Sequence, residues 1–170
     1  MERIITMMKR VLASSYAVYL KTQNYHWNIR SRHAFRSLHK LFEEQYEELA
    51  EAVDTIAEHI RQLGSLVPAS FTDFQVLSKI KDGDECLYAD QMIEDLAEDQ
   101  EKLIAIINEG ITLTNGTQDK ATEDLLIDRL RVHKKNKWML ESSLQERVQH
   151  IDHYERGKQE DLSISTMQEN

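Results

Sequence analysis

The chain has 170 residues, of which 41% are hydrophobic and 30% are charged, as is typical of a globular domain with an apolar core. Its formal net charge of −9 and the lack of a lysine-rich N-terminal arm weigh against strong binding to nucleic acid. No apolar run approaches the roughly 20 residues that cross a bilayer, and no signal peptide is visible. With Cys86 as its single cysteine, we expect a cytoplasmic protein without disulfides or membrane segments.

Apolar residues recur at helical spacing in four segments, and the scarcity of Gly and Pro favours long helices. The first predicted helix covers residues 2–28, with an apolar side made of Ile5, Met8, Leu12, Tyr16, Tyr19 and Trp27. The second covers residues 34–63 and carries an apolar residue at every seventh position, namely Phe35, Phe42, Leu49, Ile56 and Leu63. Gly64 should end it.

Residues 64–86 form a long connection in which we expect a short helix over residues 70–80. The third long helix is predicted over residues 86–109, through Met92, Ile93, Leu96, Leu103 and Ile107. The fourth starts near Thr122, an N-cap residue type, or a few residues earlier, and continues through Leu126, Leu130, Trp138 and Leu144. We therefore predict an all-α four-helix bundle over residues 1–154 and a polar C-terminal tail over 155–170, with the second and third long helices parallel.

Two pairs of possible metal ligands lie on the second helix. His39 and Glu43 are four residues apart, and so are Asp54 and Glu58, so each pair shares a helix face. At about 1.5 Å rise per residue, His39 and Glu58 are about 28 Å apart, which is too far for one ion. The ordinary alternative is that each pair simply faces water.

The two pairs are symmetric about the midpoint of Glu48 and Leu49. If two copies of this helix pack antiparallel about a two-fold axis, His39 of one chain lies level with Glu58 of the other. Two equivalent metal sites would then form, each from both chains. His26, near the end of the first helix, could add a nitrogen ligand.

The motifs HWN at 26–28, F-x-x-LH at 35–39 and DTIAEHIRQLG at 54–64 resemble the Dps family, the mini-ferritins named DNA-binding proteins from starved cells. The similarity extends to DKATEDLL at 119–126 and WML at 138–140. It implies a ferritin-like bundle, a hollow dodecamer, ferroxidase activity with hydrogen peroxide, and iron storage that protects against oxidative stress. The ligands it implies are His26, His39 and Glu43 of one chain with Asp54 and Glu58 of its partner.

The same resemblance implies that Asp119, Asp124 and Asp128 line pores for iron, although acids early in a helix also complement its dipole. Trp27 could intercept stray oxidising equivalents or simply pack in the core.

Carboxylate and imidazole ligands suit iron, but they also suit zinc, manganese or cobalt. The alternative function is DNA compaction, and a further one is a plain interaction bundle.

The sequence departs from the family pattern in the loop NIRSRHAF, which has Ser31 in place of a frequent glycine and one extra residue. Glu43 stands where aspartate is frequent. No histidine follows a glutamate by three residues, so the Glu-x-x-His motif of ferritins is absent. We expect His33 and His59 at the surface, with His33 the better occasional ligand. Glu44, Glu47, Glu48 and Glu51 form an acidic face that we expect to be largely solvated, although some of these residues could nucleate mineral on an inner wall.

Overall fold

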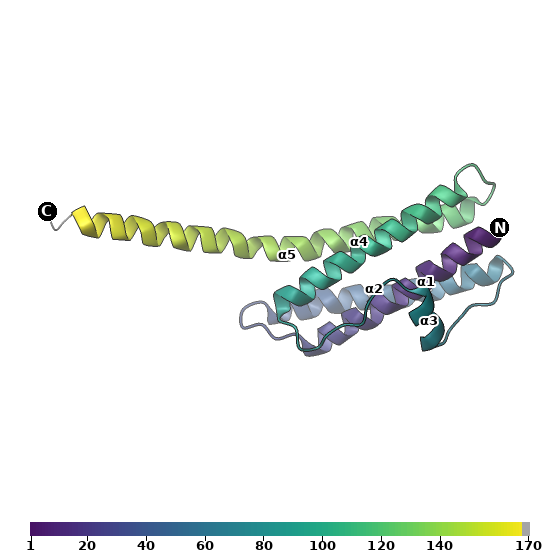
Figure 1. Cartoon of the computed structure of the whole chain (residues 1–170), viewed down its shortest axis with the longest axis horizontal. Coiled ribbons are helices and arrows are strands. Elements are labelled where there is room, and N and C mark those ends of the chain that lie inside the picture. The colour runs from purple at the N-terminus through teal and green to yellow at the C-terminus, as the bar shows by residue number, and fades with distance from the viewer. Residues whose placement is uncertain (168–170) are drawn as a thin grey trace.

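The computed structural model describes the backbone of residues 1–167 and the side chains of residues 1–144. The described backbone forms helices α1 (Glu2–Asn28), α2 (Phe35–Gln62), α3 (Phe71–Leu77), α4 (Ala89–Thr114) and α5 (Lys120–Met167), and no strand (Figure 1). The predicted all-α class is therefore confirmed, together with a short helix in the long connection. Over the same residues, no helix combines the length and apolar composition needed to cross a membrane.

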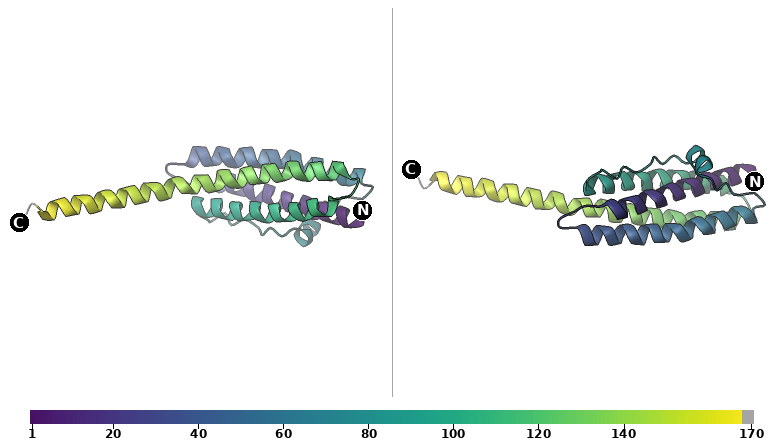
Figure 2. Two further views of the ribbon diagram at one scale, coloured as in Figure 1. Left: turned by 90° about the horizontal axis from the view of Figure 1, so that it is seen from above. Right: turned by 90° about the horizontal axis from the view of Figure 1, so that it is seen from below.

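The four long helices pack side by side (Figures 1 and 2). Helix α1 packs against α2 and α4, and α5 packs against α4 and approaches α2. Short loops make α1 antiparallel to α2 and α4 antiparallel to α5. The connection that carries α3 along α1 returns the chain to the other end of the bundle, so α2 and α4 run in the same direction, as predicted.

Helix α2 buries most of its predicted apolar column. Phe42, Leu49 and Ile56 have no exposed surface, whereas Phe35 at the start of the column is 44% exposed. The prediction of Phe35 as a core residue was therefore wrong. Gly64 has a φ of +83°, a left-handed conformation that suits glycine, and it follows directly after the end of the helix as predicted.

Helix α4 buries the residues predicted for it, but it starts at Ala89 and continues beyond Glu109 to Thr114. Gly110 lies inside the helix, at a position where side chains of two neighbouring helices approach its backbone. A Cβ atom on Gly110 would come within 2.9 Å of Leu126 on α5 and 3.2 Å of Met7 on α1. This glycine therefore permits close packing of three helices.

Helix α5 starts at Lys120 and continues to Met167, beyond its predicted end at Tyr154. Asp119 accepts hydrogen bonds from the backbone N–H of Thr122 at 3.2 Å and from its hydroxyl at 2.7 Å. Asp119 therefore caps this helix, and the prediction of Thr122 as the cap was wrong. The division into a bundle and a C-terminal tail stays a prediction.

The buried face of α5 also differs from the prediction. Trp138 is 64% exposed, and the residues that point inward are Leu126, Arg129, His133, Asn136 and Leu140. These residues are three or four positions apart and form one helical stripe. The prediction failed because three polar residues occupy the middle of that stripe.

A buried ion cluster joins α1 to α4. Lys21 Nζ lies 2.9 Å from Asp95 Oδ2 and 2.5 Å from Asp99 Oδ2, and Lys102 Nζ lies 2.9 Å from Asp99 Oδ1. Lys21 is 3% exposed and Asp99 has no exposed surface. The opposite charges compensate each other where water cannot, so removal of one partner is costly.

The long connection is attached at this same cluster. The Tyr25 hydroxyl donates to Asp95 Oδ2 at 2.5 Å and accepts from the backbone N–H of Asp84 at 3.4 Å. Burial, helped by Asp95, raises the pKa of Tyr25 well above its ordinary value. A Cβ atom on Gly83 would come within 2.9 Å of Lys21 Cγ, so only glycine fits this approach without displacement.

We expect Asp99→Asn to destabilise the metal-free protein by about 3 kcal/mol, because Lys21 and Lys102 each lose a buried counter-charge. Asp95→Asn is the matched control and should cost about 1 kcal/mol, since Asp95 is partly exposed and the amide can still accept from Tyr25. Urea unfolding followed by circular dichroism measures both. Equal losses in the two variants would contradict this account of the cluster.

Candidate metal centre

Two histidines meet where α1 ends and α2 begins. His26 Nδ1 lies 2.9 Å from the backbone carbonyl oxygen of His39, and His39 Nδ1 lies 2.9 Å from that of His26. The two imidazole rings are stacked, with centroids 3.7 Å apart and planes inclined by 21°. This reciprocal pair holds the end of one helix against the start of the next.

The pair also determines the protonation pattern of both rings. A carbonyl oxygen can only accept, so each Nδ1 carries the hydrogen and donates it. In the neutral imidazole, Nε2 then carries the lone pair that binds metals. A hydrogen bond from the ring nitrogen that does not bind the metal orients a metal-binding histidine and strengthens its other nitrogen as a ligand. The two residues therefore fit the role of nitrogen ligands for a metal ion.

Glu43 lies one helical turn beyond His39 and supplies a carboxylate. Its Oε2 atom forms an ion pair with Lys40 Nζ at 2.8 Å. The hydrogen bond from Lys40 lowers the pKa of Glu43, its charge adds to the effect, and His26 and His39 lower it slightly further. The carboxylate therefore remains ionised into acidic conditions. Lys40 also competes with any metal ion for the same oxygen.

Aromatic side chains surround the histidine pair. The Phe35 ring stacks on His39 at 5.1 Å, and Tyr46 meets His26 edge-on at 5.1 Å. His26 is 8% exposed, whereas Trp27 next to it is 66% exposed. Core packing, one of the two interpretations of Trp27, is therefore wrong for the single chain.

The structure separates the predicted ligands into two sets. His26, His39 and Glu43 lie at one end of α2, while Asp54 and Glu58 are exposed farther along the same helix. Among the side chains that are described, no three His, Cys, Asp or Glu residues of one chain come close enough to hold a metal ion. Whether a second chain brings the two sets together stays a prediction.

The position of His59 corrects our surface prediction. His59 is 9% exposed, and its Nε2 atom lies 2.7 Å from the Thr122 hydroxyl oxygen. That hydroxyl donates its own hydrogen to Asp119, so His59 Nε2 must be the donor. The chain of bonds ties α2 to the start of α5. His33 is exposed, as predicted.

The three candidate pore acids differ in their surroundings. Both carboxylate oxygens of Asp119 are engaged with Thr122. Asp128 pairs with Arg131 at 2.7 Å in an exposed position, and Asp124 is exposed. Asp119 therefore has a structural role as a helix cap, while Asp124 and Asp128 present carboxylates at the surface. The pore assignment itself stays a prediction.

A hydrogen-bonded series of polar side chains, which we did not predict from the sequence, lies in the middle of the bundle. Arg129 donates to both carboxylate oxygens of Glu48 and, at 3.4 Å, to His133 Nε2. His133 Nδ1 donates to Gln100 Oε1 at 2.7 Å. Burial, followed by the charge of Arg129, lowers the pKa of His133 to about 3, so the ring is neutral. Glu48, which we expected on a largely solvated acidic face, is therefore only partly exposed and is paired with Arg129.

Comparison with known proteins agrees with this architecture. The family model described as a ferritin-like domain matches residues 5–148. An uncharacterized low temperature-induced protein of Nostoc sp. is 35% identical over 84% of this chain and 80% of its own length. DNA protection during starvation protein 2 of Bacillus anthracis is 28% identical over 84% of this chain and 97% of its own length.

Among solved structures, the Dps protein of Vibrio cholerae superposes with a TM-score of 0.80 at 28% identity, over 84% of this chain and 89% of that one. It is described as a member of a broad superfamily of ferritin-like diiron-carboxylate proteins. The helix arrangement, the domain match and these relatives lead to one conclusion: the chain belongs to the Dps family of ferritin-like proteins.

Proposed function

We propose that this protein oxidises ferrous iron at sites shared by two chains and stores the ferric product, protecting the cell against oxidative stress. The observation that carries the proposal is the reciprocal His26–His39 pair, which leaves an Nε2 lone pair on each ring, with the ionised Glu43 carboxylate one helical turn beyond His39. The diiron-carboxylate description of a relative in the same family supports iron as the metal.

The donor set suits this chemistry. Imidazole and carboxylate together bind iron, and they also accept zinc and other divalent ions, which would compete with it. Ionised carboxylates favour ferric over ferrous iron because their hard negative charge interacts more strongly with the higher ionic charge. With hydrogen peroxide as the oxidant, its O–O bond breaks, each of two ferrous ions supplies one electron, and two protons complete two water molecules.

Asp54 and Glu58 would complete each site from a second chain. Both are exposed on α2, so an antiparallel α2–α2 contact can bury them beside the partner's histidines. We infer a homo-oligomer built on this contact, and a dodecamer as its closed form. Asp124 and Asp128 are the candidates for conducting iron into it, and the exposed Trp27 is the candidate radical trap.

Intermolecular complementation tests the shared site. His39→Ala and Glu58→Ala should each slow ferrous oxidation severely while the assembly remains intact. A heterodimer of the two variants retains one undamaged site out of two, because His39 of one chain meets Glu58 of the other. Random coassembly should therefore restore about a quarter of the wild-type sites.

The readout is the rate of ferric absorbance growth after addition of ferrous iron and peroxide under anaerobic conditions. The control is a mixture of the two variants after separate assembly, which should remain slow. Absence of rescue in coexpressed shells of normal size would show that the site is not shared. Wild-type rates in both single variants would refute the ligand assignment.

A second prediction concerns Lys40, whose ammonium group occupies a Glu43 oxygen at 2.8 Å. Lys40→Gln removes this competitor, so ferrous or zinc ions should bind several-fold more tightly at near-neutral pH. Lys79→Gln, an exposed lysine in the long connection, is the matched control for charge. Isothermal titration with zinc measures both, and equal affinities in the two variants would show that Lys40 does not compete.

A further inference from the structure

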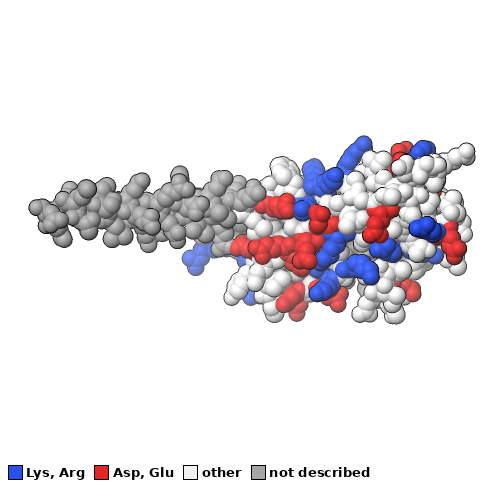
Figure 3. All heavy atoms as spheres, turned by 45° about the horizontal axis from the view of Figure 1, so that its top comes forward, with Lys and Arg blue, Asp and Glu red and all other residues white. Residues whose placement is uncertain are grey.

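Positive charge is concentrated in the first part of the chain. Residues 3–42 contain eight Lys or Arg and no Asp or Glu, although the chain has 30 acidic residues. Elsewhere the charges are mixed: on the face shown in Figure 3, acidic and basic side chains are interspersed, and Lys137 pairs with both Glu101 and Glu141. Two of these basic residues pair with acids of α4, Arg10 with Glu109 and Lys21 with Asp95 and Asp99, so the uncompensated charge lies mainly toward the α1–α2 loop.

Three arginines near the α1–α2 loop are unpaired. Half of the eight arginines with described side chains have an ion-pair or hydrogen-bond partner: Arg10, Arg61, Arg129 and Arg131. Within the described residues Arg30, Arg32 and Arg36 have none, and they follow one another through the α1–α2 loop and the first turn of α2. Their charges are not used to hold the fold together.

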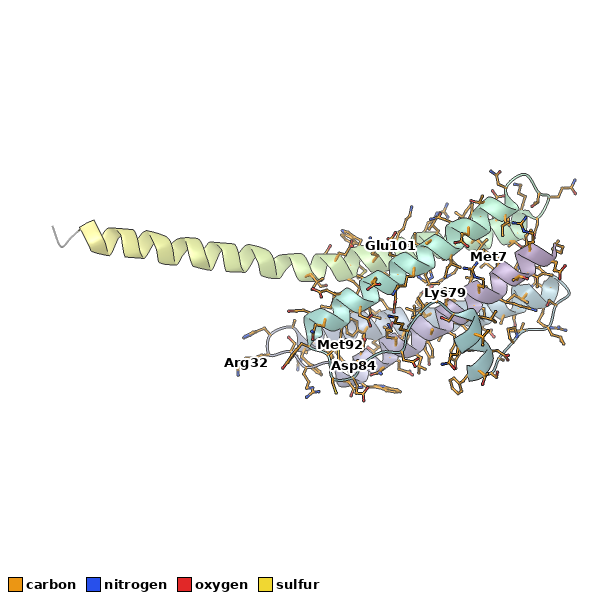
Figure 4. All side chains as sticks on the ribbon, in the orientation of Figure 1. Met7, Arg32, Lys79, Asp84, Met92 and Glu101 are labelled. Atoms are coloured by element: carbon orange, nitrogen blue, oxygen red, sulfur yellow. The ribbon has the colours of Figure 1, made fainter. Side chains whose placement is uncertain are left out.

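Two of these arginines line a cavity. A space of about 1190 Å³ lies between the α1–α2 loop, the first turns of α2, the start of α4 and residues 142–143 of α5. Its wall includes Arg30, Arg32 and His33 but not Arg36. Figure 4 shows Arg32 at this end of the bundle, opposite the end that holds Met7. Four serines add hydroxyl groups to the wall, and Asp90 is its single acidic residue.

We propose that this cavity binds a small oxyanion of the phosphate class. An arginine guanidinium presents paired N–H donors that match two oxygens of a phosphate group, and serine hydroxyls can donate to the others. The two arginines outweigh the charge of Asp90. The N-terminus of α4 adds partial positive charge along the wall, which reinforces the arginines.

The cavity is distinct from the candidate metal centre. His26, His39 and Glu43 do not line it, although the same loop leads to both. The oxyanion would therefore be held without contact with a metal ion, and its binding can be measured on metal-free protein. Failure of iron oxidation and failure of phosphate binding are thus separate results.

Titration of the metal-free, assembled protein with inorganic phosphate in a phosphate-free, low-salt buffer tests the proposal. We expect saturable binding, close to one phosphate per chain, by isothermal titration calorimetry. Arg30→Gln and Arg32→Gln should each weaken it about tenfold or more. Arg36→Gln is the matched control, because it removes the same charge from the same region without touching the cavity, and it should change affinity less than twofold.

Several outcomes would overturn the proposal. The first is absence of saturable phosphate binding by the wild type. The second is an equal loss in Arg36→Gln and Arg32→Gln, which would indicate diffuse attraction by the basic region. The third is retention of duplex DNA in a gel shift without binding of free phosphate, since the arginines would then serve a polymer rather than a small anion. Size-exclusion chromatography verifies that every variant keeps the wild-type assembly.

Discussion

The exchange of hydrogen bonds between His26 and His39 is the contact on which the candidate centre depends. Each ring uses Nδ1 to reach the backbone of the other, so one interaction sets the end of α1, the start of α2 and the tautomer of both rings. A surface histidine pair without this constraint would rotate freely and lose entropy on binding metal. Here that ordering is already present in the fold, which favours a metal ligand role.

The interior of the bundle offers no free carboxylate pair for the proposed metal centre among the residues that the structure describes. Its carboxylates already have fixed cationic partners, since Lys21 compensates the buried Asp99 and the partly exposed Asp95, and Arg129 compensates the partly exposed Glu48. A metal ion would have to displace a buried ammonium or guanidinium group and leave that charge unpaired. The reciprocal histidines and the exposed acids of α2 carry no such penalty.

Much of the fold could be predicted from periodicity, because long runs of buried Leu, Ile and Met define α2 and α4 clearly. The prediction failed for α5, where Arg129, His133 and Asn136 occupy the buried stripe and polar residues were assumed to face water. The spacing could have revealed this stripe, since the three polar residues lie at helical intervals between Leu126 and Leu140. The prediction of His59 as a surface residue also failed, because its hydrogen-bond partner Thr122 is distant in the sequence.

The candidate ligands themselves could be chosen from motifs and spacing, but their orientation could not. The sequence of the loop NIRSRHAF, which separates His26 from His39, does not indicate that the two imidazole rings stack and bond to each other's backbone. The competition of Lys40 for Glu43 was also invisible, although the two residues stand three positions apart on one helix. Such details depend on side-chain conformers, which sequence patterns do not specify.

The uneven charge along α2 has a consequence for how two copies of the chain can meet. The helix starts with Arg36 and Lys40 and becomes acidic toward Glu51, Asp54 and Glu58. Side by side in the same direction, two such helices would repel over their whole length. Reversed about the midpoint of Glu48 and Leu49, Lys40 of each helix lies near Asp54 and Glu58 of the other, so these charges favour the orientation that the proposed shared site requires.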